Sequence, residues 1–182
     1  DTEYLEHLVH DLLILGKLES ENVEINREKT KLTGIINRAL SSLENKLDKK
    51  KIQVKKDIEV NLPHMYVDEI RLHQVMINLL ENAIHYSPEN GGILIKAEKV
   101  KGELKISVID DGPGIPQDQL DKIWQRFYKI DKARTRKEKK GSGLGLSIVK
   151  NIIKQHNGRV EAENTNKRGA CFSLYLPLSD KE

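Results

Sequence analysis

Residues Ile77–Pro88, which read INLLENAIHYSP, lie in the stretch that decides the fold of this chain. From Leu72 onward, apolar residues recur every three or four positions, which predicts an amphipathic helix. The apolar face comprises Leu72, Val75, Met76, Leu79, Leu80 and Ala83, and the polar face comprises Gln74, Asn78, Glu81, Asn82 and His85. Asn78 and Asn82 are one helical turn apart, and Asp68 is a suitable N-cap residue. Taken alone, this polar face is typical of a surface helix exposed to solvent.

The composition indicates a soluble globular protein. Its 182 residues correspond to one domain of about 150 residues with a short extra piece, and 37% of them are hydrophobic. The net charge of +3 is too small to indicate a nucleic-acid partner. No apolar run is long enough to span a membrane, and the N-terminus does not resemble a signal peptide. Because Cys171 is the single cysteine, we expect no internal disulfide and a cytoplasmic location for this portion of the protein.

Upstream of the central helix, the pattern predicts two helices and two strands. The expected elements are a helix at 3–18, a strand at 23–28, a helix at about 31–49 and a strand at 52–60. The first helix has leucines at spacings of three and four, which favours packing on a partner helix. For the second helix we expect Thr30 as the cap, and the lysine-rich run 46–51 at its end suits the helix macrodipole.

Downstream of the central helix, the pattern predicts two hairpins and one more helix. The expected elements are strands at 93–100 and 103–110, short helical turns at 116–128, a helix at about 144–156 and strands at 159–164 and 171–177. Lys101-Gly102 supplies the turn of the first hairpin, and Asn157-Gly158 closes the helix, as a glycine at a helix C-terminus does. These elements alone indicate an α+β domain.

Two glycine-rich turns are candidates for ligand binding. Asp110-Asp-Gly-Pro-Gly114 ends a predicted strand, where glycines let the backbone approach a ligand closely. Gly141-Ser-Gly-Leu-Gly145 opens a predicted helix, whose N–H groups can bind an anion. Taken separately, the first turn is also compatible with an ordinary strand-ending turn. The second lacks the preceding strand of a dinucleotide-binding motif.

The order of these segments resembles the ATP-binding domain of sensor histidine kinases. The asparagine helix is followed by DxGxG, by GxGLGL and by a C-terminal hairpin, and the resemblance covers residues 24–178. The stretch IWQRFYKID at 123–131 resembles the phenylalanine block of these kinases. LEHLVHDLLILGKLES at 5–20 resembles the second helix of their dimerisation and phosphotransfer domain. The superfamily also contains gyrase, MutL and the heat-shock chaperone.

The resemblance implies a two-layer α/β sandwich of the α+β type. In this fold a mixed sheet of about five strands is covered by about three helices, and here one amphipathic dimerisation helix precedes it. We therefore expect residues 1–21 to belong to the dimerisation and phosphotransfer helix. Residues 22–182 are expected to form the catalytic ATP-binding domain, with a lid at 129–141.

The resemblance also implies a site for ATP with Mg²⁺ on the central helix. Asn82 matches the Mg²⁺ ligand of the family. Asn78 matches the position at which hydrolysing relatives carry a glutamate base, and an asparagine cannot take a proton. His85 matches a lysine or arginine that faces phosphate, although a solvated histidine fits that position equally well. Tyr86 matches the residue that packs on adenine.

The glycine-rich turns supply the other contacts that the resemblance implies. Asp110 matches the aspartate that accepts the amino group of adenine, and its neighbour Asp111 is expected to be a bystander. The adenine pocket would be shaped by Gly112, Gly114 and Ile115, and the phosphate turn would comprise Gly141, Ser142, Gly143, Leu144, Gly145 and Leu146. In the lid, Lys129 and Arg134 would reach the terminal phosphate and, with Asn78, form the expected catalytic set. Ala170 departs from the family, in which a threonine or serine hydroxyl helps to bind a water beside adenine.

The implied activity is transfer of the γ-phosphate of ATP to a histidine, for onward signalling to the receiver domain of a response regulator. In the family the acceptor lies on the first dimerisation helix, which would precede Asp1. His7 and His10 lack the usual His-Glu-x-x-Thr-Pro surroundings, so we expect this chain alone not to phosphorylate itself. The full-length protein would be a homodimer with a possible membrane anchor, whereas this portion could be monomeric.

Two other functions remain open at this point. An ATP-hydrolysing clamp of the same superfamily is disfavoured by Asn78 and by the block at 123–131. A non-catalytic nucleotide-binding scaffold is disfavoured by the presence of Asn82, Asp110 and both glycine-rich turns.

Overall fold

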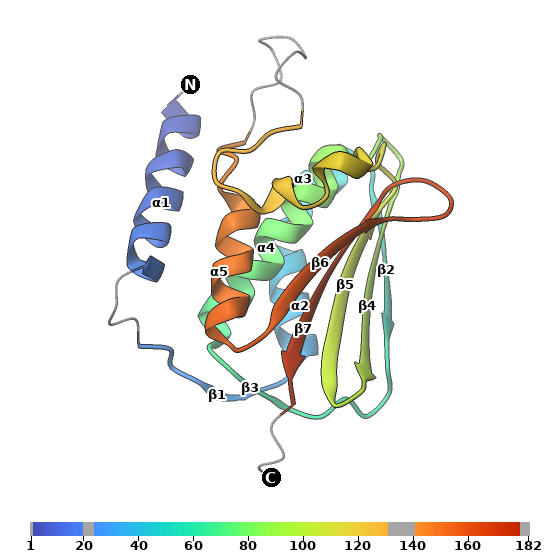
Figure 1. Ribbon diagram of the computed structural model, residues 1–182. Coiled ribbons are helices and arrows are strands. Elements are labelled where there is room, and N and C mark those ends of the chain that lie inside the picture. The colour runs from blue at the N-terminus through green and yellow to red at the C-terminus, as the bar shows by residue number, and fades with distance from the viewer. Residues whose placement is uncertain (1, 20–23, 131–140, 179–182) are drawn as a thin grey trace.

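The computed structural model describes residues 2–19, 24–130 and 141–178. Its helices are α1 (Thr2–Glu19), α2 (Leu32–Ser42), α3 (Glu44–Lys49), α4 (Glu69–Tyr86) and α5 (Gly145–Gln155), with 3₁₀ turns η1 (Gln117–Gln119) and η2 (Lys122–Trp124). Its strands are β1 (Glu28–Thr30), β2 (Gln53–Ile58), β3 (Met65–Val67), β4 (Gly92–Val100), β5 (Glu103–Asp110), β6 (Arg159–Asn164) and β7 (Ala170–Pro177). Helices α2, α4 and α5 cover one face of the main sheet, and α1 stands beside α5 (Figure 1). This arrangement confirms the predicted two-layer sandwich.

The main sheet has five strands in the order β2-β4-β5-β7-β6. Strand β2 pairs in parallel with β4 and the other neighbours are antiparallel, so the sheet is mixed, as predicted. Parallel neighbours require a long crossover connection, and α4 lies in the connection from β2 to β4. Alternate residues in the central part of the inner strands face the helices and are at most 3% exposed: Ile93, Ile95, Ala97, Leu104, Ile106, Val108, Phe172, Leu174 and Leu176.

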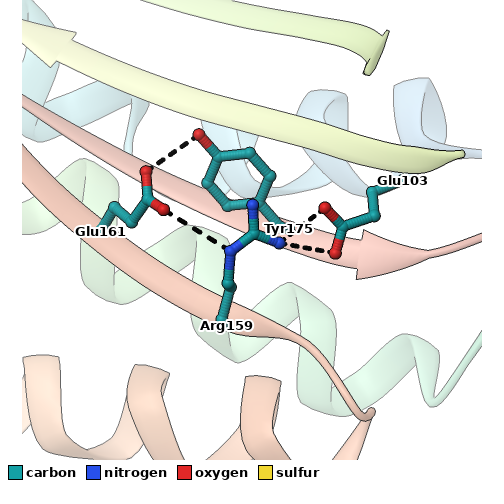
Figure 2. Close-up of polar contacts among 4 residues, drawn as sticks. All are labelled: Glu103, Arg159, Glu161 and Tyr175. Atoms are coloured by element: carbon teal, nitrogen blue, oxygen red, sulfur yellow. Dashed lines mark hydrogen bonds and ion pairs between the residues drawn. The ribbon is translucent and has the colours of Figure 1, made fainter. Parts of the chain in front are cut away.

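A polar network covers the outer face of the sheet near the edge strand β6 (Figure 2). The Arg159 guanidinium lies 3.7 Å from the centre of the Tyr175 ring, and its Nη1 donates to both carboxylate oxygens of Glu103 at 2.5 and 2.6 Å. The Tyr175 hydroxyl donates to Glu161 at 3.0 Å. The network therefore links β5, β7 and β6 on the face that lacks helices.

The central helix α4 follows the prediction closely. Asp68 is its N-cap, and the Asp68 carboxylate accepts a hydrogen bond from the Arg71 N–H at 3.0 Å. The predicted apolar face is at most 1% exposed at Leu72, Val75, Met76, Leu79, Leu80 and Ala83. Contacts with α2, with α5 and with strand β5 of the sheet explain why this face is fully buried.

Helix α1 packs on the sandwich through the end of its leucine seam. Leu15 and Leu18 are buried, and the Leu18 carbonyl accepts a hydrogen bond from Gln155 of α5 at 2.7 Å. The earlier part of the helix leaves Leu5, Val9, Leu12 and Leu13 exposed. Within the described ranges, no helix combines the length and apolarity needed to cross a bilayer.

The predicted helix at 31–49 is wrong in its continuity and in its cap. The segment forms two helices, α2 and α3, separated at Leu43. The Ser42 hydroxyl donates back to the Arg38 carbonyl at 3.0 Å, a contact that weakens and bends helices. Thr30 ends β1, where its hydroxyl donates to the Glu28 carbonyl, and the N-cap position belongs to Lys31.

The predicted strand at 23–28 lies later in the chain, because β1 begins at Glu28 and pairs with β3 outside the main sheet. The preceding residues use their polar groups on helix ends. The Asn26 N–H donates to the Asp68 carboxylate at 3.2 Å, and the Arg27 guanidinium donates to the Gln155 carbonyl at 3.0 Å. Residues 24–27 therefore bond to the ends of α4 and α5 and do not form a strand.

Asn157 and Gly158 close α5, as predicted. Asn157 adopts the left-handed conformation (φ 59°), and the Gly158 N–H donates to the Ile153 carbonyl at 2.9 Å. A glycine is needed at 158 because a Cβ there would lie 2.3 Å from the Tyr175 carbonyl oxygen. Just before this turn, His156 accepts a hydrogen bond from the Asp68 N–H through Nε2 at 3.0 Å, while its Nδ1 lies 2.8 Å from the Ile152 carbonyl. Burial lowers the pKa of His156, so a neutral ring joins α5 to the start of α4.

Candidate functional site

The first glycine-rich turn folds back on the carboxylate at its own start. Asp110, the last residue of β5, is 2% exposed, and its Oδ1 accepts hydrogen bonds from the N–H groups of Gly112 at 2.8 Å and Ala170 at 3.3 Å. Among the described residues, its Oδ2 accepts none. Burial raises the pKa of the Asp110 carboxyl, and the charge of Asp111 adds to this rise. The site therefore offers one carboxylate oxygen of a largely buried residue, with no hydrogen bond among the described residues, to a donor on a ligand.

The glycines of this turn permit close contact with two neighbouring elements. A Cβ on Gly112 would lie 2.7 Å from Asp110 Oδ1 and 3.0 Å from the carbonyl oxygen of Tyr86. Gly114 has φ +79°, and a Cβ there would lie 2.8 Å from Asn164 Oδ1. The turn thus fits between the C-terminal end of α4 and the end of β6, which brings the predicted residues Tyr86 and Asp110 to one place.

The polar face of α4 meets the second glycine-rich turn. Asn78 Oδ1 accepts a hydrogen bond from Gln74 at 2.9 Å, and Asn78 Nδ2 donates to the Gly145 carbonyl at 3.1 Å. Asn82 lies one turn further along α4 and is half-buried. The structure therefore places the asparagine face beside the start of α5.

The second turn is tied to the segment before it and to α1. Gly143 has φ +75°, and its carbonyl accepts a hydrogen bond from the Phe127 N–H at 2.9 Å. The Ser142 hydroxyl donates to the Asp11 carboxylate of α1 at 2.6 Å and accepts from the Leu144 N–H at 3.1 Å. Leu144 is fully buried, so only its backbone can face a ligand, whereas Gly141 is exposed and Leu146 is half-exposed.

The C-terminal end of α4 presents His85 and Tyr86 at the surface. Both side chains are exposed, and their rings lie edge to face with centroids 4.8 Å apart. Below them, Lys50 Nζ donates to the carbonyl oxygens of Ile84, His85 and Ser87 at 2.7, 2.8 and 2.7 Å. We expected the lysine-rich run to interact with the C-terminal end of the helix that contains it, but Lys50 instead caps the C-terminal end of α4.

The structure also involves two residues that sequence reasoning missed or dismissed. Asp111, expected to be a bystander, accepts a hydrogen bond from the Gly92 N–H at 2.7 Å and so ties the turn to the start of β4. Asn164 bonds both backbone groups of Ile115. A short polar side chain at the end of a strand is the one signal in the sequence that could have indicated Asn164.

The predicted lid is described only at its two ends. Lys129 is exposed and Ile130 is half-buried against the core. Gly141 begins the next described segment, and Arg134 lies outside the described residues. The roles of Lys129 and Arg134 stay predictions.

Comparison with known proteins assigns the family. The family model described as histidine kinase-, DNA gyrase B-, and HSP90-like ATPase matches residues 67–180. The chain is 35% identical over 188 residues to the sensor histidine kinase WalK of Bacillus subtilis (strain 168). This match covers 100% of this chain and 30% of WalK.

Two solved structures share the fold at 28% sequence identity. They are full-length ShkA in complex with AMPPNP (TM-score 0.84, 96% of this chain and 36% of ShkA) and histidine kinase ThkA in complex with the response regulator protein TrrA (TM-score 0.80, 100% of this chain and 49% of the matched chain). The chain spans less than half the length of the full-length relatives that it matches. It belongs to the histidine kinase-, DNA gyrase B- and HSP90-like ATPase family, in which it is a histidine kinase ATP-binding catalytic domain.

Proposed function

We infer that this chain binds ATP together with Mg²⁺ and transfers the γ-phosphate to a histidine on a dimerisation helix, from which it passes to a response regulator. The observation that carries this proposal is the hydrogen bond from Asn78 to the Gly145 carbonyl. It joins the polar face of α4 to the N-terminal end of α5, where N–H groups favour an anion. The Asp110 carboxylate lies about two turns further along, near the C-terminal end of α4 and beside Tyr86. A nucleotide could therefore contact both glycine-rich turns along one helix.

The residues on α4 fit a metal that is shared with phosphate. Asn82 is half-buried on the same face as Asn78, and its amide oxygen is a suitable ligand for Mg²⁺ when phosphate oxygens complete the coordination. When bound, Mg²⁺ would neutralise charge on the phosphates. Asn78 would position groups near them, since its amide is already oriented by Gln74 and Gly145. An amide cannot act as a base for water, which supports transfer to a side chain over hydrolysis.

The partners of ShkA and ThkA support the rest of the proposal. ShkA was solved with AMPPNP and ThkA with a response regulator. For this chain, we propose the receiver domain of a response regulator as the partner that takes the phosphate. The N-terminal helix α1, which resembles a dimerisation helix, would bring two copies of the longer protein together. Residues 1–21 and 22–182 would thus form the dimerisation and catalytic parts, in a cytoplasmic portion of that protein.

Replacing Asn82 by alanine should reduce the gain in triphosphate affinity that Mg²⁺ provides. One lost metal ligand is expected to lower that gain roughly tenfold, or about 1.4 kcal/mol. Calorimetry with a non-hydrolysable ATP analogue, with Mg²⁺ and with EDTA, measures it. Asn45→Ala on α3 is the matched control because Asn45 is an exposed helical asparagine that does not belong to the asparagine face of α4. A variant that keeps the full Mg²⁺ enhancement would show that Asn82 is not a ligand.

Labelling with γ-radiolabelled ATP tests the transfer itself. We expect the longer protein that includes the preceding dimerisation helix to become labelled on a histidine, in an acid-labile linkage. The 182-residue chain should remain unlabelled because neither His7 nor His10 has acceptor surroundings. Label on either of these residues, or rapid release of phosphate without labelled protein, would contradict the proposed kinase function.

A further inference from the structure

Asn164 makes two hydrogen bonds to Ile115, at the end of the first glycine-rich turn. It is the last residue of β6, and its Oδ1 accepts from the Ile115 N–H at 2.7 Å while its Nδ2 donates to the Ile115 carbonyl at 2.7 Å. A side-chain amide thus forms both bonds that a neighbouring strand would form with Ile115. Both distances are short for bonds between neutral N–H and C=O groups. The pair fixes the position and the orientation of the peptide at the end of the turn.

The β6–β7 hairpin, to which Asn164 belongs, also contacts the start of this turn at Asp110. Asn164 pairs in register with Ala170, whose N–H donates to Asp110 Oδ1 at 3.3 Å. At the neighbouring Gly169, a Cβ would lie 1.8 Å from the Asp110 carbonyl oxygen. The β6–β7 hairpin therefore contacts residue 110 through β7 and residue 115 through Asn164. Between these points the turn contains Gly112 and Gly114, which restrain its conformation least.

We propose that Asn164 is a positioning residue for base recognition, which holds the turn so that Asp110 can accept the exocyclic amine of adenine. This inference rests on the proposed nucleotide-binding function. A carboxylate–amine hydrogen bond requires a narrow range of distance and angle, so a turn released at Ile115 would bond the amine less well. The side chain of Asn164 is exposed, and water can replace it on Ile115. Its loss should therefore affect the ligand more than the fold.

Binding of ADP and of inosine diphosphate separates this role from a general loss of stability. Inosine diphosphate lacks the exocyclic amine, so it reports contacts other than the one with Asp110. We expect Asn164→Ala to weaken ADP roughly three- to tenfold, the value of one hydrogen bond, and to weaken inosine diphosphate less. The affinity for ADP divided by the affinity for inosine diphosphate should therefore fall, while the melting temperature of the free protein changes little.

Two further variants sharpen the test. Asn164→Asp keeps the acceptor for the Ile115 N–H but places an oxygen against the Ile115 carbonyl, so its affinity ratio should fall at least as far. Asn166→Ala, at the exposed tip of the same hairpin, should leave the ratio unchanged. Hydrogen exchange should show faster exchange of the Ile115 amide in Asn164→Ala.

The outcomes distinguish the inference from the proposed function. If ADP and inosine diphosphate weaken by the same factor in Asn164→Ala, or if neither weakens, Asn164 does not position the turn for the base. If the unaltered chain binds no ADP, the proposed nucleotide site fails and this inference fails with it. An unchanged Ile115 exchange rate would also overturn the positioning role.

Discussion

Replacing Asp110 by asparagine is expected to weaken ADP binding roughly 10- to 100-fold, which corresponds to about 1–3 kcal/mol for a buried donor left without its acceptor. The variant keeps Oδ1, which can still accept from Gly112 and Ala170. It replaces Oδ2 by an NH₂ group, which would face the adenine amine as donor against donor. Calorimetry with ADP measures the loss, and Asp118→Asn in the exposed turn η1 is the control. Undiminished ADP affinity would overturn the assignment of Asp110 to the adenine site.

The same variant should make the free protein more stable at neutral pH. Burial raises the pKa of Asp110, so the folded state holds that proton more tightly than the unfolded state. The free energy of unfolding therefore falls as the pH rises from the ordinary pKa of an aspartate through the raised value, and it stays lowered above that window. Asparagine does not ionise, so the Asp110→Asn variant should not lose unfolding free energy in this pH range.

Thermal melting against pH checks this sign. The stability advantage of Asp110→Asn should be full at neutral pH and should disappear as the pH falls below the ordinary pKa of aspartate. Binding lost together with stability gained would identify Asp110 as a residue retained for its ligand. A variant less stable than the original protein at every pH would show that its carboxylate is needed for folding.

Replacing Lys50 by methionine should have the largest effect on stability. The change removes three charge-assisted hydrogen bonds to the C-terminal carbonyls of α4, each of which contributes roughly 1.5–3 kcal/mol. Because water can reach part of this site, we expect a net loss of about 2–4 kcal/mol. For a chain of this size that corresponds to a fall in melting temperature of roughly 5–12 °C.

A matched lysine provides the control for this change. Lys49→Met, one residue earlier and exposed on α3, should leave the melting temperature within about 1–2 °C. Lys50→Arg should recover only part of the loss, because a planar guanidinium cannot direct its donors at three carbonyls around one point. Equal melting temperatures for Lys50→Met and Lys49→Met would show that the cap contributes nothing. ADP binding should also weaken in Lys50→Met, because Lys50 holds the last turn of helix α4, which ends at Tyr86.

Local patterns were sufficient for most of the elements. The period of the apolar residues predicted α4 and its buried face, and the alternation along β4, β5 and β7 predicted strands that lie in the sheet. Period and alternation report which side of an element faces the core, and that property depends on near neighbours in the chain. The glycines of the two turns were recognisable for a similar reason, since positive φ at Gly114 and Gly143 is a local requirement.

Elements without a strong period were less predictable. The helix at 31–49 looked continuous, yet it breaks at Leu43 after a serine that bonds its own helix. Strand β3 has three residues and exists because β1 lies beside it, so nothing within its own sequence marks it. At the end of α5, a glycine is required at 158 by the close approach of the Tyr175 carbonyl oxygen, and no local pattern shows that approach.

By itself, the sequence determined the order of the elements and motifs, and its resemblance to a known family implied the sandwich and the residues expected in a nucleotide site. The tertiary structure alone decided how those residues are held. Lys50 reaches Ser87 across 37 residues, Asn164 reaches Ile115 across 49, and Asp11 reaches Ser142 across 131. No periodicity or turn propensity connects positions so far apart. Such contacts depend on which elements the core packing brings together, so the supports of the site become visible only when the chain is folded.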